Sequence, residues 1–419
     1  MSLQSRVKKM LFEEPDPKKI MRGIGFFLLK TALTPARKYD LRAEKKLSLV
    51  LYNHARRFFK YPQKAVFTSL FTPVELMHAF GLCPFSLEML AGVAASMDLA
   101  PELLAGTERA WISTDFCSFH RAYIEIARIG LLPAPSFVFA TAHTCDGTYK
   151  SFSEVSTLMS RPFIFLDTPY YADRAAIDYL AKQLRDAAEQ IEGLTMVPFD
   201  REKLEKAFSF SNRARSALLE IHEIRKKERP LLYGESSLPF ITIWGSLLGH
   251  REGAALFERF RDELKRRSRT GWSEIKGRKR ILWLHLKPYF PNRLVSFIEK
   301  ELGAVIVAEE VNSVFWDELD IRSPWESLAR KLMGNYWVGG IEKRLDNIRQ
   351  IIESHHIDGV LHFSHWGCRQ SNGGVRLIKD TVMEYGIPFL NLDGDCIDGR
   401  SYSEAQYLTR LEGFMELLD

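Results

Sequence analysis

Apolar residues along this chain fall into two kinds of run. Short, almost wholly apolar runs that end in polar turns are typical of strands buried in a parallel sheet. Such runs occupy residues 66–69, 136–140, 162–166, 280–286, 304–308, 359–363 and 388–392. Longer stretches with apolar residues at helical spacing lie between them, including 119–129, 173–191 and 341–355. This alternation predicts parallel sheets covered by helices.

The alternation is interrupted by a segment without a strong strand pattern. Residues 201–269 consist of highly charged helical runs, and the first 64 residues also have helical spacing and few turn signals. We therefore predict an α/β fold in which a helical segment joins two flavodoxin-like or Rossmann-like parallel-sheet domains. The predicted units are a helical basic N-terminal region (1–64), a first α/β domain (65–200), a helical connector (201–272) and a second α/β domain (273–419).

Composition places the chain among ordinary globular proteins. Of its 419 residues, 46% are hydrophobic and 26% are charged, with a net charge of +5 concentrated near the N-terminus. A basic segment can contact nucleic acid, a membrane or an anionic cofactor, but we interpret this one as a solvated helical face or docking arm. Residues 23–33 are too short for a membrane helix, which needs about 18 apolar residues, and Lys30 interrupts them. We read no signal peptide, and we expect a cytoplasmic protein with no nucleic-acid partner and no membrane span.

Four of the five cysteines occur in two matched units. Cys117 and Cys145 are 28 positions apart (145 − 117), and so are Cys368 and Cys396 (396 − 368). Each unit reads cysteine, helix, glycine, proline, strand, cysteine. A helix between parallel strands begins at the carboxyl edge of the sheet and the next strand returns to that edge, so both cysteines of a unit should lie there. Two such edges facing each other would offer four thiols to one site.

We predict that these four cysteines hold an iron–sulfur cluster. The odd cysteine count argues against a disulfide framework, and no CxxC pair or finger-like spacing suggests zinc. Helix N-termini after Cys117 and Cys368 would favour thiolates. Neighbouring side chains could tune the cluster by hydrogen bonds to sulfur, namely Ser118, His120, His143, Ser364 and His365. The alternative is that a cysteine serves as a small buried hydrophobe, and we favour that role for Cys83.

Several motifs resemble one known family. They are FTPVELMHAFG (71–81), DFCSFHRA (115–122), TCDGTYK (144–150), HWGCRQ (365–370) and the tail that begins LDGDCIDGRSYSEAQYL (392–408). Together they cover roughly residues 65–418. In this combination the chain resembles the 2-hydroxyacyl-CoA dehydratase and benzoyl-CoA reductase family, whose relatives include the double-cubane cluster proteins.

The resemblance implies a chemistry and a set of partners. It implies an oxygen-sensitive 4Fe–4S cluster between two α/β domains, an anaerobic enzyme and an acyl-CoA substrate. It implies a low-potential electron from an ATP-hydrolysing iron–sulfur activator protein, used for radical dehydration or for reduction, and a homo- or heterodimer with a related subunit. The chain has no GxxxxGK[ST] phosphate loop, so ATP hydrolysis would be the partner's.

The resemblance also assigns site residues. The family's three cluster cysteines fall on Cys117, Cys145 and Cys368, and its catalytic glutamate falls on Glu75, a candidate acid or base. The alternative for Glu75 is a carboxylate at a helix start, where Pro73 would open the first turn and Thr72 would cap it.

This chain departs from the family pattern in two places. Cys396 would be a fourth cluster and metal ligand that closes the iron left open for substrate. Glu88 stands where the double-cubane branch has a further cysteine. A closed cluster favours an alternative function, a non-catalytic electron-transfer or scaffold subunit. A third possibility is a zinc- or cluster-stabilised binding protein.

Overall fold

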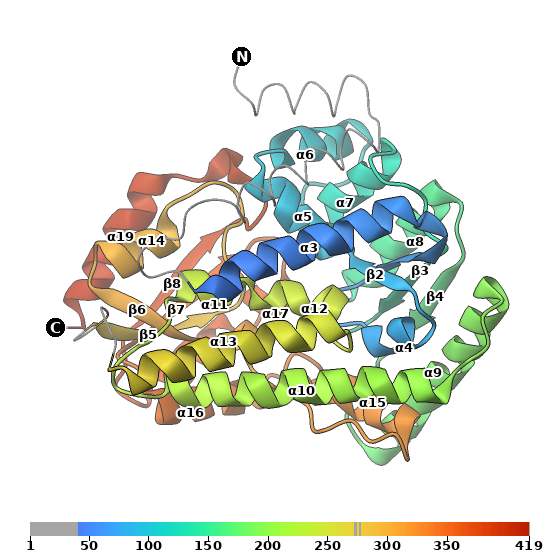
Figure 1. Ribbon diagram of the computed structural model, residues 1–419. Coiled ribbons are helices and arrows are strands. Elements are labelled where there is room, and N and C mark those ends of the chain that lie inside the picture. Colours follow the sequence, from blue (N-terminus) through green and yellow to red (C-terminus); the bar gives the residue numbers. More distant parts are fainter. Residues whose placement is uncertain (1–40, 272–274, 276–277, 419) are drawn as a thin grey trace.

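Two four-stranded parallel sheets form the framework of the protein. The computed structural model describes residues 41–271, 275 and 278–418 (Figure 1). The first sheet has the order β2-β1-β3-β4 and the second has the order β6-β5-β7-β8. The strands are β1 (Ala65–Thr68), β2 (Cys83–Ser86), β3 (Phe137–Thr141), β4 (Phe163–Leu166), β5 (Lys279–Leu284), β6 (Ala304–Glu309), β7 (Gly359–His365) and β8 (Phe389–Gly394). The prediction of an α/β fold with parallel sheets and a helical N-terminal region is confirmed.

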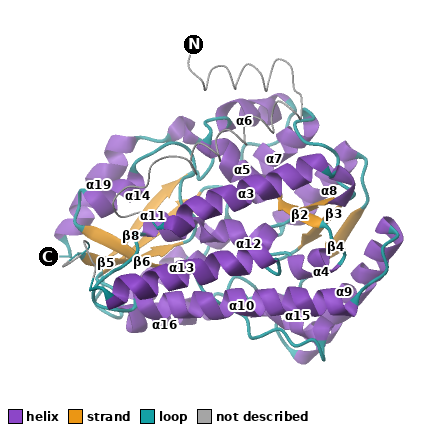
Figure 2. Ribbon diagram, in the orientation of Figure 1, coloured by secondary structure: helices purple, strands orange, loops and turns teal. Residues whose placement is uncertain are grey.

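Helices separate and cover the two sheets (Figure 2). Those of the first half are α3 (Arg42–Lys60), α4 (Val74–Ala79), α5 (Leu87–Ser96), α6 (Ala100–Arg109), α7 (Ser118–Arg128), α8 (Gly147–Met159) and α9 (Arg174–Thr195). The connecting helices are α10 (Arg201–Arg225), α11 (Gly234–Ser237), α12 (Ile241–Leu247) and α13 (Arg251–Arg269). The second half has α14 (Leu294–Lys300), α15 (Pro324–Gly334), α16 (Glu342–His355), α17 (Arg369–Asn372), α18 (Val375–Met383) and α19 (Glu404–Glu416).

The two halves share one apolar core. Phe67 and Val138 from the first sheet belong to the same buried cluster as Trp283 and Leu361 from the second. Helix α10 packs along α13 and touches both α4 of the first half and β6 of the second (Figure 1). The predicted helical connector therefore contacts both halves, and α15 returns from the second half to pack on α9.

Three local features differ from the predictions or lie outside them. Strand β2 was missed, because its sequence, CPFS, is short and carries a proline that suits only an edge strand. The predicted cap at Thr72 is wrong: Pro73 occupies the N-cap of α4, and the Thr72 hydroxyl pairs with that of Ser69 at 2.8 Å. Most of the predicted N-terminal region, residues 1–40, lies outside the described residues.

Within the described ranges no single helix is long and apolar enough to cross a membrane; only α5 and α6, bent by 119° at their junction, pass that test as a pair.

Candidate functional site

The carboxyl ends of both sheets open onto one cavity. In each sheet the first and third strands in sequence are neighbours, β1 beside β3 and β5 beside β7, and ligands of open α/β sheets bind at such switch points. The loops that follow these four strands line a cavity of about 950 Å³ whose walls are mostly apolar. Residues from these loops and from the strand ends include Phe71, His143, Cys145, His285, His365 and Cys368.

Three of the four predicted thiols line this cavity. Cys117 and Cys368 are the N-caps of α7 and α17, and Cys145 precedes α8 by two residues. All three are partly buried and free of disulfides. The structure thus brings to one cavity cysteines that are up to 251 residues apart (368 − 117), three of the four that the matched units predict to meet.

Burial raises the pKa of all three thiols. Burial raises the pKa of Cys117 well above its usual range, and the neighbouring thiols of Cys368 and Cys145 raise it further. Burial likewise raises the pKa of Cys145 to about 11. Backbone N–H groups of Phe119 and His120 oppose the shift at Cys117, but more weakly. A thiolate set in this position becomes stable when bound metal supplies compensating charge.

The loops that carry the thiols approach each other closely. A Cβ at Gly367 would lie 2.6 Å from Cys117 Cα, so only glycine fits where these two segments of the chain meet. At Gly147, a Cβ would lie 3.3 Å from Cys145 Sγ. The backbone therefore passes close to Cys117 at Gly367 and close to the Cys145 sulfur at Gly147.

The chemistry of the thiols can be compared with that of a metal cluster. Within the described ranges, no group of three or more His, Cys, Asp or Glu side chains is already arranged around one ion position. Three thiols with backbone N–H groups directed at sulfur, around a cavity far larger than an ion, are the environment that iron–sulfur clusters use. Buried ring nitrogens also lack a hydrogen-bond partner among the described residues, including His120 Nδ1 and His285 Nδ1.

Cys396 lies beside the site but not on the cavity surface. Its side chain is fully buried in the shared core and is absent from the described cavity lining. Its backbone N–H donates to His365 Nδ1 at 3.1 Å, and its carbonyl accepts from Tyr289 N–H at 2.7 Å. Strand β8 ends only two residues before Cys396, whereas β3 ends four residues before Cys145, so the second turn stays closer to its sheet. Cys396 as a fourth ligand stays a prediction.

Glu75 occupies a buried ion pair away from the cavity. It is fully buried on α4, accepts a hydrogen bond of 2.6 Å from Ser211 and pairs with the Lys331 ammonium of α15. Among the described cavity-lining residues Glu75 does not appear, although Phe71 and His143 do. Its role as acid or base stays a prediction.

Other charged groups do line the cavity. Burial raises the pKa of Glu88 to about 7, and its carboxylate accepts from the Ser86 hydroxyl at 3.0 Å. Lys287, whose ammonium lies 5.4 Å over the Tyr289 ring, also lines it, and burial lowers the pKa of Lys287. The sequence does not mark Glu88 or Lys287 as part of a ligand site, because no local pattern shows which polar residues will face a cavity.

His285 is a further site residue that the sequence did not reveal. It follows β5 with φ +67°, a left-handed conformation that costs energy for a non-glycine residue. The Glu310 carboxylate accepts a hydrogen bond of 3.0 Å from the backbone N–H of His285. The Arg344 guanidinium donates two hydrogen bonds, of 2.5 and 2.9 Å, to the same carboxylate. This buried pair keeps His285 Nε2 at 3.6 Å from Cys368 Sγ.

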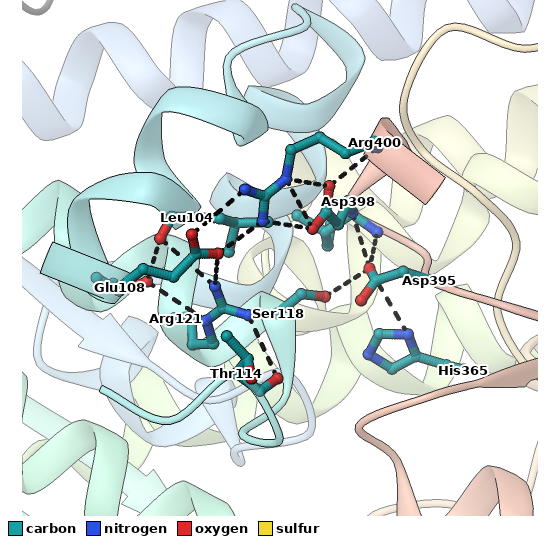
Figure 3. A network of polar contacts seen from close by, with 11 residues as sticks. Leu104, Glu108, Thr114, Ser118, Arg121, His365, Asp395, Asp398 and Arg400 are labelled. Atoms are coloured by element: carbon teal, nitrogen blue, oxygen red, sulfur yellow. Dashed lines mark hydrogen bonds and ion pairs between the residues drawn. The ribbon is translucent and has the colours of Figure 1, made fainter. Parts of the chain in front are cut away.

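A polar network links the two halves next to the cysteines (Figure 3). The Ser118 hydroxyl donates to Asp395 Oδ1 at 2.6 Å. Beside this contact, Arg121 and Arg400 each reach Glu108 at 2.7 Å. The first turn of α7, which follows Cys117, is thereby bound to the turn that carries Cys396.

Comparisons with known proteins found a matching family model and several related subunits. A family model described as 2-hydroxyglutaryl-CoA dehydratase, D-component, matches residues 69–418. The chain is 23% identical over 362 residues to the (R)-phenyllactyl-CoA dehydratase alpha subunit of Clostridium sporogenes, an alignment that covers 83% of this chain and 87% of the relative. It is 23% identical over 375 residues (84% and 89%) to the (R)-2-hydroxyisocaproyl-CoA dehydratase alpha subunit of Clostridioides difficile. It is 24% identical over 347 residues (76% and 80%) to a benzoyl-CoA reductase subunit of Thauera aromatica.

Proposed function

Because this chain belongs to the 2-hydroxyglutaryl-CoA dehydratase D-component family and is a component of the dehydratase or benzoyl-CoA reductase type, we propose that it is the iron–sulfur subunit that binds and converts an acyl-CoA. The observation that carries the proposal is the convergence of three thiols from both sheets on one large, mostly apolar cavity. An apolar cavity with a few polar groups suits an acyl chain and its thioester.

We propose that Cys117, Cys145 and Cys368 hold a 4Fe–4S cluster. When bound, this cluster supplies one low-potential electron. Lys287 provides a cation for the thioester oxygen or another anionic group of the ligand. Two carboxylates are candidates for proton transfer, Glu75 from the family motif and Glu88 from the cavity wall.

The proposal includes partners. Each relative named above is a subunit of a larger enzyme, and we propose that this chain pairs with a second, related subunit or with a copy of itself. An ATP-hydrolysing iron–sulfur activator would deliver the electron. We further propose a reducing, cytoplasmic and anaerobic setting, which suits five free cysteines.

The test begins with protein purified without oxygen. We expect iron and acid-labile sulfide in equal amounts, and an electron paramagnetic resonance signal after reduction. Adding (R)-phenyllactyl-CoA, (R)-2-hydroxyisocaproyl-CoA or benzoyl-CoA should change that signal. Zinc without iron or sulfide would refute the cluster.

A non-catalytic electron-transfer subunit is the second candidate. Cys396 favours it, because this thiol is close enough to Cys117 and Cys368 for all three to influence one another electrostatically. A fourth thiolate would leave no iron for substrate. A reduced signal that no acyl-CoA changes, in a protein that still passes electrons to a partner subunit, would support this function.

A further inference from the structure

Both ring nitrogens of His365 have partners, one in each half of the protein. His365 is the last residue of β7, and its side chain is 1% exposed. On one side Nδ1 accepts the Cys396 N–H at 3.1 Å. On the other side Nε2 lies 3.3 Å from Cys117 Sγ, on a helix of the first half. The ring meets that of Phe119 edge to face, with centroids 5.5 Å apart.

The neighbours of His365 determine where its proton sits. Since Nδ1 accepts a backbone N–H, the ring proton must be on Nε2. Asp395 does not compete for it: its Oδ1 is 3.9 Å from Nδ1 and already accepts from Ser118, Ile397 and Asp398 (Figure 3). The Nε2–H therefore points at the sulfur of Cys117.

We propose that His365 is a positioning residue that donates Nε2–H to the Cys117 thiolate and raises the reduction potential of the cluster; this inference rests on the proposed function. A hydrogen bond to sulfur becomes stronger as the sulfur gains negative charge. It stabilises the cluster more after the electron arrives than before. The donor comes from the second sheet and the thiolate from the first, so the same bond also fixes the distance between the two halves.

His285 is a weaker candidate for the same task. Its Nε2 is 3.6 Å from Cys368 Sγ, which is longer than the His365 contact. Its Nδ1 has no partner among the described residues, so nothing fixes its proton on Nε2. The geometry therefore assigns the role to His365.

The experiment compares three variants in the full-length protein. His365→Phe keeps a ring against Phe119 but has no donor. His365→Gln places an amide N–H near the position of Nε2. The control is His362→Phe, because His362 is equally buried on the same strand and its Nδ1 pairs with Asn391 at 2.7 Å rather than with a cysteine. After anaerobic purification, iron and sulfide content and the midpoint potential of the cluster are measured.

We expect the midpoint potential of His365→Phe to shift to a more negative value, that of His365→Gln to stay near the wild type, and that of His362→Phe to change little. If His365→Phe loses the cluster, then cluster content in His365→Gln decides: retention supports the proposal and equal loss refutes it. An intact cluster with an unchanged potential in His365→Phe also refutes it. Wild-type protein without iron and sulfide would instead overturn the proposed function, and this inference with it.

Discussion

Replacement of Glu75 by glutamine separates its two possible roles. The side chains of Glu75 and Lys331 are 0% and 6% exposed, and Ser211 donates to the same carboxylate. Glu75→Gln leaves the Lys331 ammonium buried without a counter-charge, which costs about 3–5 kcal/mol. With an unfolding entropy of about 2 cal/mol/K per residue over 419 residues, the melting temperature should fall by roughly 3–6 °C.

The double variant Glu75→Gln, Lys331→Met removes both charges and keeps a group that can accept from Ser211. It should recover most of the lost stability, because no unpaired charge remains. A matched control is Arg376→Ala, which breaks an exposed ion pair with Asp380 on α18 and should leave the melting temperature unchanged.

The assays are thermal unfolding by circular dichroism and turnover in the assembled system. If Glu75 acts only in the fold, the double variant regains both stability and turnover. If Glu75 is an acid or base, the double variant regains stability while turnover stays low. An unchanged melting temperature in Glu75→Gln would refute the reasoning from burial.

Three further predictions concern the cavity. Cys396→Ser should keep its iron while Cys145→Ser loses most of it, since Cys145 lines the cavity and Cys396 does not; loss of iron in Cys396→Ser, measured by metal analysis, would establish a fourth ligand. Gly367→Ala should lower cluster content, because its Cβ would meet Cys117 backbone atoms at 2.6 and 3.0 Å, and Gly413→Ala, with open space around it, should not. Glu88 has a pKa of about 7 in the folded protein against 4.5 ordinarily, so the folded state holds a proton that the unfolded chain releases between those values. The free energy of unfolding should fall by up to about 3 kcal/mol as pH rises through this window, and urea titrations of Glu88→Gln should show a flatter dependence.

The local pattern of apolar and polar residues was sufficient to predict most strands of the two sheets. The apolar runs at 136–140 and 359–363 became β3 and β7, displaced by at most two residues at either end. Cysteines placed before a helix or after a strand were expected at one sheet edge, and Cys117, Cys145 and Cys368 do meet there. These inferences succeed because periodicity and chain reversal are local properties of a βαβ unit.

The tertiary structure decided what each site residue faces. The spacing made Cys145 and Cys396 equivalent, yet the shorter turn after β8 holds Cys396 inside the core. The partner of Glu75 lies 256 residues away on α15, and His365 Nδ1 accepts a hydrogen bond from the backbone N–H of Cys396, in another loop. The sequence by itself determined seven of the eight described strands, the family, and the sheet edge that carries Cys117, Cys145 and Cys368. Only the packing of one half against the other decided which side chains line the cavity and which are buried in ion pairs, because those contacts join residues that no local pattern relates.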